Sequence, residues 1–430
     1  MSSKERMVDP AGQFSLADFY FPETDDPLQV PPDFIAWRKN VGWALSLCEP
    51  ILSTAAEARC TLDSESGPHE VINMSSYGYL GLVRHPQILA AAHQALDHYG
   101  TGACGSPILS GKNVLHCELE KKLTNLLGRE GVLIFNSGFG GAMGSIASLL
   151  RKGDAAVLDE RAHVSLVNGA KVAGAKLAFF RHNDPQSLNE VLAKEKERRR
   201  MVIVEGIYSM DGDMADLPAL LEVTRAHEVG VFIDEAHSIL ACGPTGGGVA
   251  EHFGVGKEIG VQFATFSKSF SACGGFVAAS SDLIDYMRFY ADSYGFSCAM
   301  PPVIVAGLSA AVDVARAETW RRDRLWENAT YFKDRLHELG IDTGESNTYV
   351  VPLMVGDDRI LLFEMGQELR KRGLFVAPVD YPTVPLDQVR FRATVTAAHS
   401  RDDIERALQI IADVLVPALR AKNKLRVRQV

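Results

Sequence analysis

The chain has 430 residues, and its 44 Lys and Arg against 54 Asp and Glu give a formal net charge of −10 at pH 7. Hydrophobic residues make up 47% of it, so the length is sufficient for a large core and for two or three domains. The negative balance excludes an overall basic field for the phosphates of nucleic acid or of an anionic membrane, so we predict no nucleic-acid partner. An anionic ligand would have to be bound by a local site.

The cysteines and the N-terminus indicate the compartment. The seven cysteines are dispersed and contain no Cys-x-x-Cys pair, which argues against a disulfide framework and against a cysteine-rich zinc site. The first 14 residues lack the apolar core of a signal peptide, and no apolar run has the length of a membrane helix. We therefore expect a soluble, cytoplasmic protein with no membrane span and no bound metal.

The organisation of the chain changes twice. Residues 1–70 begin rich in proline and acid and then become helix-like, which predicts an arm and a docking helix. In residues 71–300, short apolar runs alternate with helix-like stretches, a pattern typical of an α/β domain with a mostly parallel sheet. Residues 301–430 predict a smaller α+β domain. Ligands of parallel sheets bind beyond the carboxyl ends of the strands, so polar residues after each apolar run are the candidates for a site.

A glycine-rich turn at residues 136–144 follows one apolar run and opens a helix. Such a turn directs backbone N–H groups and the positive end of the helix toward an anion, most often a phosphate. The spacing does not fit a dinucleotide site, because Met143 stands where the third glycine would be, and no Walker lysine follows. Close packing of a helix on a strand explains the glycines equally well.

Two charged residues also follow apolar runs. Asp234 ends VGVFID, where an unpaired buried carboxylate would be strongly destabilising, so it needs a partner. Lys268 lies among small residues in TFSKSFSACGG, where partial desolvation would lower its pKa and permit Schiff-base chemistry. The string DEAH does not indicate a helicase, because no Walker sequence precedes it. A satisfied structural carboxylate and a solvated surface ammonium remain as alternatives for the two residues.

The order of these features favours one chemistry. The glycine turn, His163, Asp234 and Lys268 follow successive apolar runs in that order. Pyridoxal 5'-phosphate requires a phosphate cradle, a partner for its ring, a carboxylate on its pyridine nitrogen and a lysine for its aldehyde. The ordered set therefore predicts a pyridoxal phosphate site.

Several motifs between about Ile72 and Leu408 resemble the α-oxoamine synthase family of fold-type I pyridoxal-phosphate enzymes. They include YGYLGL, SGFGG, RAHVSL, VEGIYSMDGD, IDEAHS, GPTGGGVAEHFG, TFSKSF, CAMPP, PTVP and RFRATVTAAH. The family includes 8-amino-7-oxononanoate synthase, glycine C-acetyltransferase, 5-aminolevulinate synthase and serine palmitoyltransferase. The motif EGIYSMDG suggests the serine palmitoyltransferase branch. The resemblance implies an α/β fold-type I transferase with a large, mostly parallel sheet domain and a smaller C-terminal α+β domain.

The resemblance also implies roles for the residues that match the family's cofactor site. Lys268 would bond the cofactor aldehyde, and Asp234 would pair with the pyridine nitrogen. His163 would stack on the ring and donate a hydrogen bond to a reacting oxygen, while His237 would hydrogen-bond the ring's phenolic oxygen. The other matching cofactor residues are Ser137, Gly138, Phe139, Ser209, Thr265 and Ser297.

Three further residues match positions near the substrates. Arg392 matches the arginine that grips the amino-acid carboxylate, for which a bidentate guanidinium is suited, and Arg390 is the weaker candidate. Thr383 matches a residue near the acyl substrate. Tyr77 stands where many members carry an asparagine that assists the carboxylate, and Pro107 replaces an arginine near the substrate mouth. These two departures leave the amino-acid substrate open.

The implied reaction is a decarboxylative Claisen condensation of an amino acid with an acyl thioester, which gives an α-aminoketone, CO2 and a free thiol. The acyl donor would be acyl-CoA or an acyl-carrier protein. The resemblance further implies a homodimer in which the loop with Ser297 reaches toward the neighbour's cofactor. Two alternatives remain: another fold-type I reaction such as transamination, and a non-catalytic partner subunit of a synthase.

Overall fold

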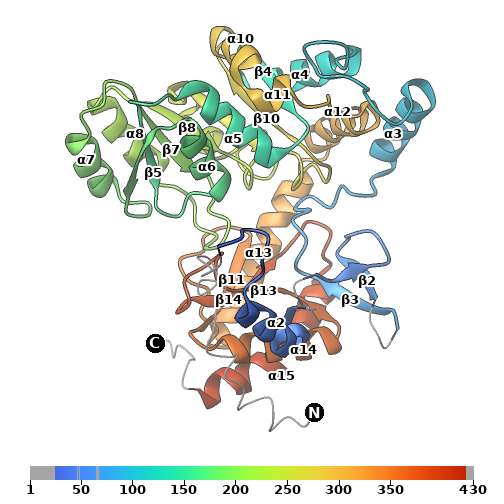
Figure 1. Ribbon diagram of the computed structural model, residues 1–430. Coiled ribbons are helices and arrows are strands. Elements are labelled where there is room, and N and C mark those ends of the chain that lie inside the picture. The colour runs from blue at the N-terminus through green and yellow to red at the C-terminus, as the bar shows by residue number, and fades with distance from the viewer. Residues whose placement is uncertain (1–24, 46, 48, 64–66, 423–430) are drawn as a thin grey trace. The chain divides into compact units, whose positions relative to one another are not determined.

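The computed structural model describes residues 25–45, 47, 49–63 and 67–422. Its internal contacts divide the chain into two units, which are described separately here (Figure 1). The large unit consists of Tyr77–Glu327 with Thr396–Ala398. The composite unit combines Met1–Ser76, Asn328–Val395 and His399–Val430, so it is assembled from both ends of the chain.

A seven-stranded sheet forms the centre of the large unit. Its strands are β4 (Gly131–Phe135), β5 (Ala155–Asp159), β6 (Lys176–Phe180), β7 (Arg200–Glu205), β8 (Gly230–Asp234), β9 (Val261–Thr265) and β10 (Gly275–Ala279). They lie in the order β4-β10-β9-β8-β7-β5-β6. All neighbours run parallel except β10, which is antiparallel to both β4 and β9. The predicted α/β class with a mostly parallel sheet is confirmed.

Burial explains why most of these strands are continuous apolar runs. Every residue of β5, β9 and β10 is buried, as in sheets that are covered on both faces. The apolar cluster against the sheet includes Leu133, Ile146 and Phe232. The edge strand β6, whose burial is interrupted and whose Phe179 is 47% exposed, was not identified from the sequence.

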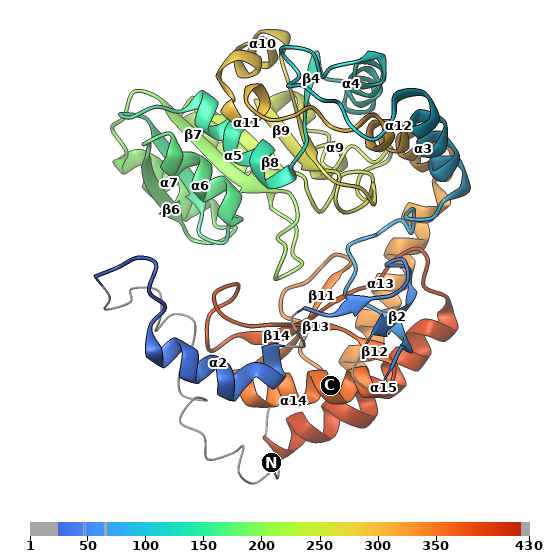
Figure 2. The ribbon, with the colours of Figure 1, turned by 45° about the vertical axis from the view of Figure 1, so that its right-hand side comes forward.

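Helices connect these strands and cover the sheet. They are α3 (Pro86–Tyr99), α4 (Val114–Leu127), α5 (Gly138–Leu149), α6 (Val164–Val172), α7 (Pro185–Lys194), α8 (Leu217–Ala226), α9 (Val249–His252), α10 (Ser281–Tyr290), α11 (Asp292–Gly295) and α12 (Pro302–Ala317). Figure 2 shows α5 and α6 side by side against the sheet. Asp184 and Asp216 cap α7 and α8, each followed by a proline within the first turn, which is a favourable helix start.

Where the structure describes it, the composite unit contains two small sheets and four helices. One sheet has the order β1-β2-β3-β12 and the other β11-β14-β13. The strands are β1 (Ile51–Leu52), β2 (Arg59–Asp63), β3 (His69–Asn73), β11 (Val350–Gly356), β12 (Leu374–Phe375), β13 (Ala377–Val379) and β14 (Val389–Thr394). The helices are α2 (Pro32–Leu45), the second half of α13 (Trp320–Glu338), α14 (Arg359–Lys371) and α15 (Arg401–Ala421).

Long-range pairing joins the N-terminal segment to the C-terminal part of the chain. The Ile72 N–H donates to the Gly373 carbonyl at 2.8 Å, and β3 runs parallel to β12. The Arg59 guanidinium also donates to Asp403 at 2.7 Å. The unit boundaries, after Ser76 and after Glu327, therefore differ from the expected breaks at residues 70 and 300. Helix α12 stays in the large unit because it packs against α3 and α4.

No helix within the described ranges has both the length and the apolar character needed to cross a bilayer. Helix α15 is amphipathic. Ser400 and Asp403 form a capping box at the start of α15, and Ile411 on its inner face is fully buried in the core of the composite unit. The N-terminal segment and α15 thus share one core.

We expect Ile411→Ala to lower the free energy of unfolding by about 2–5 kcal/mol, because it removes buried methyl groups and leaves a cavity. Arg406→Ala on the exposed side of the same helix is the matched control, with an expected change within about 0.5 kcal/mol. Urea unfolding of the two variants measures the difference. Equal effects would show that α15 does not pack on this core.

Candidate active site

Four polar residues end four strands of the large sheet. Asp159, Glu205, Asp234 and Thr265 are the last residues of β5, β7, β8 and β9. Because β5, β7, β8 and β9 run parallel, these residues lie at one edge of the sheet. The segments that follow them carry His163, Ser209, His237 and Lys268. The edge where parallel sheets bind ligands is therefore lined by the residues that the sequence predicted.

Asp234 is a carboxylate buried among the central strands. It is 4% exposed, and its Oδ1 accepts a hydrogen bond of 2.8 Å from the Ala236 N–H. Burial raises the pKa of Asp234 to about 6, while the positive charge of Lys268 and the Ala236 hydrogen bond act in the opposite direction. The carboxylate is thus suited to a cationic partner.

Lys268 lies in the turn that connects β9 to β10. The turn is closed by hydrogen bonds from the Phe266 N–H to the Gly274 carbonyl at 2.9 Å and from the Ser271 N–H to the Lys268 carbonyl at 2.8 Å. Lys268 is half-buried, and its charge acts on both Asp234 and His163. The structure therefore brings together the lysine, the carboxylate and the histidine that the sequence singled out.

His163 caps the N-terminus of α6. Its backbone N–H donates to Glu205 Oε1 at 2.6 Å, and its ring Nδ1 lies 2.7 Å from the Ser165 hydroxyl. Its ring is 6.2 Å from the Phe139 ring, edge to face. The residue is exposed at the surface of the unit, yet desolvation of the imidazole and the nearby Lys268 charge lower its pKa. His163 is therefore a neutral aromatic ring beside a lysine.

The glycine turn combines both interpretations that its sequence allowed. Ser137 caps α5, and its Oγ accepts a hydrogen bond of 3.1 Å from the Gly140 N–H. A Cβ on Gly138 would stand 2.4 Å from Thr265 Oγ1 and 3.1 Å from the Gly274 carbonyl, so the start of the helix packs closely on the strands. The same turn leaves the N-terminus of a 12-residue helix at the carboxyl edge of the sheet.

His237 has a partner that sequence reasoning missed. The Tyr79 hydroxyl lies 2.6 Å from His237 Nδ1, and both residues are buried. If the hydroxyl donates to Nδ1, the imidazole proton is on Nε2, which can then donate to a ligand oxygen. Tyr79 belongs to the YGYLGL motif, but a buried aromatic residue in an apolar motif gives no sequence signal for this contact.

Three further predicted residues lie in loops of the large unit. Ser209 is half-buried in the 206–216 loop after β7, and Ser297 is half-buried after α11. The segment with Ser297 is tied to the glycine turn, because the Asn136 amide donates to the Cys298 carbonyl at 2.7 Å. Tyr77 is 43% exposed at the beginning of the unit.

Arg392 and Thr383 belong to the composite unit. Arg392 is 5% exposed on β14, and Thr383 is exposed in the turn before that strand. Arg390 is also buried, but its guanidinium donates to the backbone and side-chain oxygens of Gln388 at 2.9 and 3.1 Å. This local bonding gives Arg390 a structural explanation and keeps Arg392 as the candidate for binding an anion.

Two buried carboxyl groups were not predicted. Burial and the nearby Asp234 charge raise the pKa of Glu205 well above its ordinary value, although its carboxyl accepts the His163 N–H. Burial raises the pKa of Glu235 to about 7, and this group accepts hydrogen bonds from the Val249 and Ala250 N–H groups at 2.8 and 2.9 Å. Glu235 thereby fixes the turn 243–249. The sequence signal that could have identified both residues is an acidic residue at the end of an apolar run or directly after that end.

No group of three or more His, Cys, Asp or Glu in the described part of the chain is arranged to hold a metal ion. The polar groups at the carboxyl edge instead include a lysine, a neutral histidine and a helix N-terminus. Such a set is suited to an organic anion with an aromatic ring.

The fold and this site define an α/β protein of the fold-type I class. The family model for aminotransferases of class I and II matches residues 69–411, so the chain belongs to that family. The chain is 37% identical over 361 residues to 8-amino-7-oxononanoate synthase from Thermoanaerobacter pseudethanolicus, covering 82% of this chain and 91% of the relative. The corresponding enzyme from Symbiobacterium thermophilum is 38% identical over 387 residues, covering 89% and 97%. These relatives confirm the resemblance to α-oxoamine synthases.

Solved structures agree with the family. The serine palmitoyltransferase of S. paucimobilis, described with a bound PLP–myriocin aldimine, superposes with a TM-score of 0.85 at 29% identity, covering 91% of this chain and 98% of that one. The serine palmitoyltransferase of Sphingomonas wittichii gives a TM-score of 0.86 at 27% identity, covering 93% and 100%. A longer relative is 4-hydroxy-2,2'-bipyrrole-5-methanol synthase from Serratia sp., 36% identical, of which the match covers 55%, against 84% of this chain.

We expect Gly138→Ala to destabilise the protein by about 1–3 kcal/mol, because its Cβ would overlap Thr265 Oγ1 and force the start of α5 away from the strands. Gly140→Ala is the matched control, since the nearest atoms to its Cβ lie 3.4–3.8 Å away and alanine favours a helix. Thermal unfolding measures both. Adding Thr265→Ala to Gly138→Ala should restore part of the loss, and no restoration would contradict this packing.

Proposed function

We propose that this chain is a pyridoxal-phosphate-dependent synthase that condenses an amino acid with an acyl thioester and releases CO2 and a free thiol, giving an α-aminoketone. The observation that carries the proposal is the gathering of Asp234, His163 and Lys268 at the carboxyl edge of the large sheet. Relatives whose names denote 8-amino-7-oxononanoate synthases support the reaction class.

The residues present fit pyridoxal phosphate. Its phosphate would lie at the N-terminus of α5, where Ser137, Gly138 and Phe139 form the first turn and any larger residue at 138 would fill the cradle. The exposed ring of His163 offers a stacking face. The half-buried Ser209, the buried Thr265 and the neighbouring protomer's Ser297 would supply further hydroxyl groups to the cofactor.

Asp234 and His237 would orient the bound ring. Burial makes an isolated charge on Asp234 costly, so a protonated pyridine nitrogen against the carboxylate supplies the cation that the site requires. His237, held through Nδ1 by Tyr79, would donate from Nε2 to the phenolic oxygen. When bound, the cofactor supplies a reactive aldehyde and a ring that stabilises negative charge at the Cα of an amino acid.

Lys268 would both anchor the cofactor and move the substrate proton. Its Nζ would hold the cofactor through the aldehyde, and its position beside Asp234 would also allow it to accept the α-proton of a bound amino acid as a general base. His163 would donate a hydrogen bond to the developing oxyanion of the thioester or carboxylate, where electrostatic stabilisation has its largest effect. Arg392 would bind the amino-acid carboxylate, with Tyr77 and Thr383 near the two substrates.

The alternatives lack a favouring observation. A non-catalytic subunit would not need the lysine, yet Lys268 is present and its charge acts on Asp234. Transamination shares the same fold and family model, but the relatives that match most of the chain are named as synthases. The acyl donor would be acyl-CoA or an acyl-carrier protein. The free described cysteines support a cytoplasmic location, because reducing compartments keep thiols free.

An exposed apolar surface supports a homodimer. Leu109 and Phe296 are 84% and 88% exposed, and Ile108 Cδ1 lies 3.4 Å from the position of a Cβ on Gly295, next to Phe296. Large apolar side chains grouped on a surface mark an interaction site. The same segment carries Ser297, so a second copy seated there would lie at a proposed cofactor residue.

With added pyridoxal phosphate, the purified protein should show a visible absorbance band that borohydride removes, and Lys268→Ala should lack it. Lys257→Ala, exposed on a short helix elsewhere, is the control and should keep the band. In deuterated water, the loaded protein should exchange the α-proton of its amino-acid substrate, tested across the proteinogenic amino acids. A colourless wild-type protein, or exchange with none of them, would contradict the proposal.

We expect Leu109→Asp combined with Phe296→Asp to convert a dimer into monomers, because both changes place charge in the apolar surface. Leu28→Asp, at an exposed leucine of the composite unit, is the control and should leave the dimer intact. Sedimentation velocity over a range of concentrations measures the state. A wild-type monomer, or a double variant that remains dimeric, would contradict this arrangement.

A further inference from the structure

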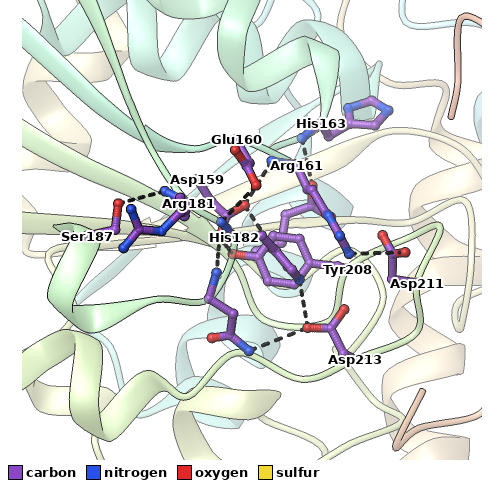
Figure 3. Close-up of polar contacts among 12 residues, drawn as sticks. Asp159, Glu160, Arg161, His163, Arg181, His182, Ser187, Tyr208, Asp211 and Asp213 are labelled. Carbon is purple, nitrogen blue, oxygen red and sulfur yellow. Dashed lines mark hydrogen bonds and ion pairs between the residues drawn. The ribbon is translucent and has the colours of Figure 1, made fainter. Parts of the chain in front are cut away.

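A buried polar cluster lies at the carboxyl ends of β5, β6 and β7, outside the residues to which the proposed function gives a role. Figure 3 shows Asp159, His182, Tyr208 and Asp213 in contact, with His163 at its border. Asp159 ends β5, His182 follows β6, and the other two residues belong to the 206–216 loop after β7. The cluster therefore joins three segments that are remote in the sequence.

Both ring nitrogens of His182 contact carboxylates. Nδ1 lies 3.0 Å from Asp159 Oδ1, and Nε2 lies 2.9 Å from Asp213 Oδ2. Ionised carboxylates only accept hydrogen bonds, so this geometry requires a proton on each nitrogen and hence an imidazolium. The ring also packs edge to face on Tyr208 at 4.4 Å, and the Tyr208 hydroxyl donates to Asp159 Oδ2 at 2.9 Å. The cation is thus enclosed by two acids and an aromatic ring.

Asp159 shapes the turn that leads to His163. Its Oδ1 accepts the Arg161 N–H at 2.8 Å, and its backbone carbonyl accepts the Ala162 N–H at 3.0 Å. The residue after this turn, His163, is the proposed stacking partner of the cofactor. A shift of the Asp159 carboxylate would therefore be transmitted over one turn of chain to the His163 ring.

Asp213, which contacts the other ring nitrogen of His182, belongs to the loop that carries Ser209. The loop is a narrow excursion: the Tyr208 N–H donates to the Asp213 carbonyl at 3.0 Å, and the Gly212 N–H donates to the Tyr208 carbonyl at 2.9 Å. Its end is also bound by Asn183, whose amide donates to the Met214 carbonyl at 3.1 Å. The bond from His182 to Asp213 thus ties the base of the Ser209 turn to β5.

We propose that His182 is a positioning residue, whose doubly bonded imidazolium holds the His163 turn and the Ser209 loop in register so that both can face one ligand. The inference deepens the proposed function and rests on it for the identity of that ligand, pyridoxal phosphate. The His182 ring bonds Asp159 and Asp213, to which that function assigns no role, so it acts through these two residues.

The charges around His182 determine the pH range in which its imidazolium is present. Burial lowers the pKa of His182, but hydrogen bonds and charges of Asp159 and Asp213 outweigh burial and raise the pKa to about 9. The Glu160 carboxylate accepts a hydrogen bond from the backbone N–H of His182, and Tyr208 is held neutral by a strongly raised pKa. The charges of Arg161 and Asp211 neutralise each other in an ion pair of 3.1 Å.

Because the pKa is raised above its ordinary value, the stabilisation from the imidazolium is fully present below about pH 6.5. It decreases above that and is lost as the pH passes about 9. Deprotonation would leave one of the two carboxylates without its donor. Because His182 links the His163 turn to the Ser209 loop, both segments should loosen on the alkaline side only.

The test compares the wild type with His182→Gln and Asp213→Asn, and with His93→Gln on the exposed side of α3 as the control. A glutamine side chain is neutral and carries both of its N–H donors on one nitrogen, so it cannot replace the donors that His182 presents from two ring nitrogens. Amide hydrogen exchange of the 160–163 and 206–216 segments is measured in the protein without cofactor. The dissociation constant of pyridoxal phosphate is measured by absorbance between pH 6 and 10, and thermal unfolding reports global stability.

We expect His182→Gln to speed exchange in these two segments and to raise the dissociation constant of pyridoxal phosphate about tenfold at pH 7. A tenfold factor is what an interaction worth about one pKa unit contributes to an equilibrium constant. The wild type should show the same change only near pH 9, and Asp213→Asn should move that change to lower pH. His93→Gln should match the wild type throughout.

Unchanged exchange and affinity in His182→Gln would overturn the inference, as would faster exchange spread evenly over the whole large unit with a lowered melting temperature. An alkaline transition that Asp213→Asn does not move would also overturn it. If the wild type binds no pyridoxal phosphate while exchange responds as expected, the proposed function fails and the positioning role of His182 stands. If the wild type binds pyridoxal phosphate while exchange in His182→Gln is unchanged, the positioning role of His182 fails and the proposed function stands.

Discussion

Burial of carboxyl groups at one edge of the large sheet is the constraint on which the rest of the site depends. Asp159, Glu205 and Asp234 end three parallel strands, and each is compensated differently. Asp159 has an imidazolium and backbone N–H groups, and these outweigh burial and lower its pKa. Burial and the Asp234 charge raise the pKa of Glu205 well above its ordinary value, while Asp234 relies on the nearby Lys268 charge. The three acids thus differ in how their charge is balanced, and Asp234 is the one that still favours a further cation.

The sequence predicted those parts of the fold and site that depend on local pattern. The strands β5 and β9, which are fully buried, and β8, which is buried after its first residue, were recognisable because parallel strands read as unbroken apolar runs. The ends of β8 and β9 led directly to Asp234 and to the turn with Lys268. The strand β6 was missed because its exposed side carries Phe179 and breaks the pattern. The sheet formed by β3 and β12 depends on pairing across some three hundred residues, for which neither partner carries a local signal.

The same limit applies to individual contacts. Tyr79 and His237 are 158 residues apart, and His182 reaches Asp213 across 31. Spacing can suggest that a histidine after a strand is useful, but it cannot specify which hydroxyl or carboxylate the fold brings to each ring nitrogen. Because the second nitrogen determines the proton position on the first, the chemistry of these histidines was decided by tertiary structure rather than by motif. Motifs located the groups, and packing assigned their protonation.

The turn that carries Lys268 differs in kind from the other segments of the site. His163 and Ser209 lie in connections from a strand to a helix, whereas Lys268 joins two strands that pair directly, with Thr265 opposite Gly275. Both ends of its turn are therefore fixed by the ladder, and Gly274, at a φ of +99°, has backbone and side-chain atoms within 3 Å of where a Cβ would be. An insertion or deletion in this turn would therefore disturb the pairing of β9 with β10, so the sheet itself sets the place from which the Lys268 side chain extends.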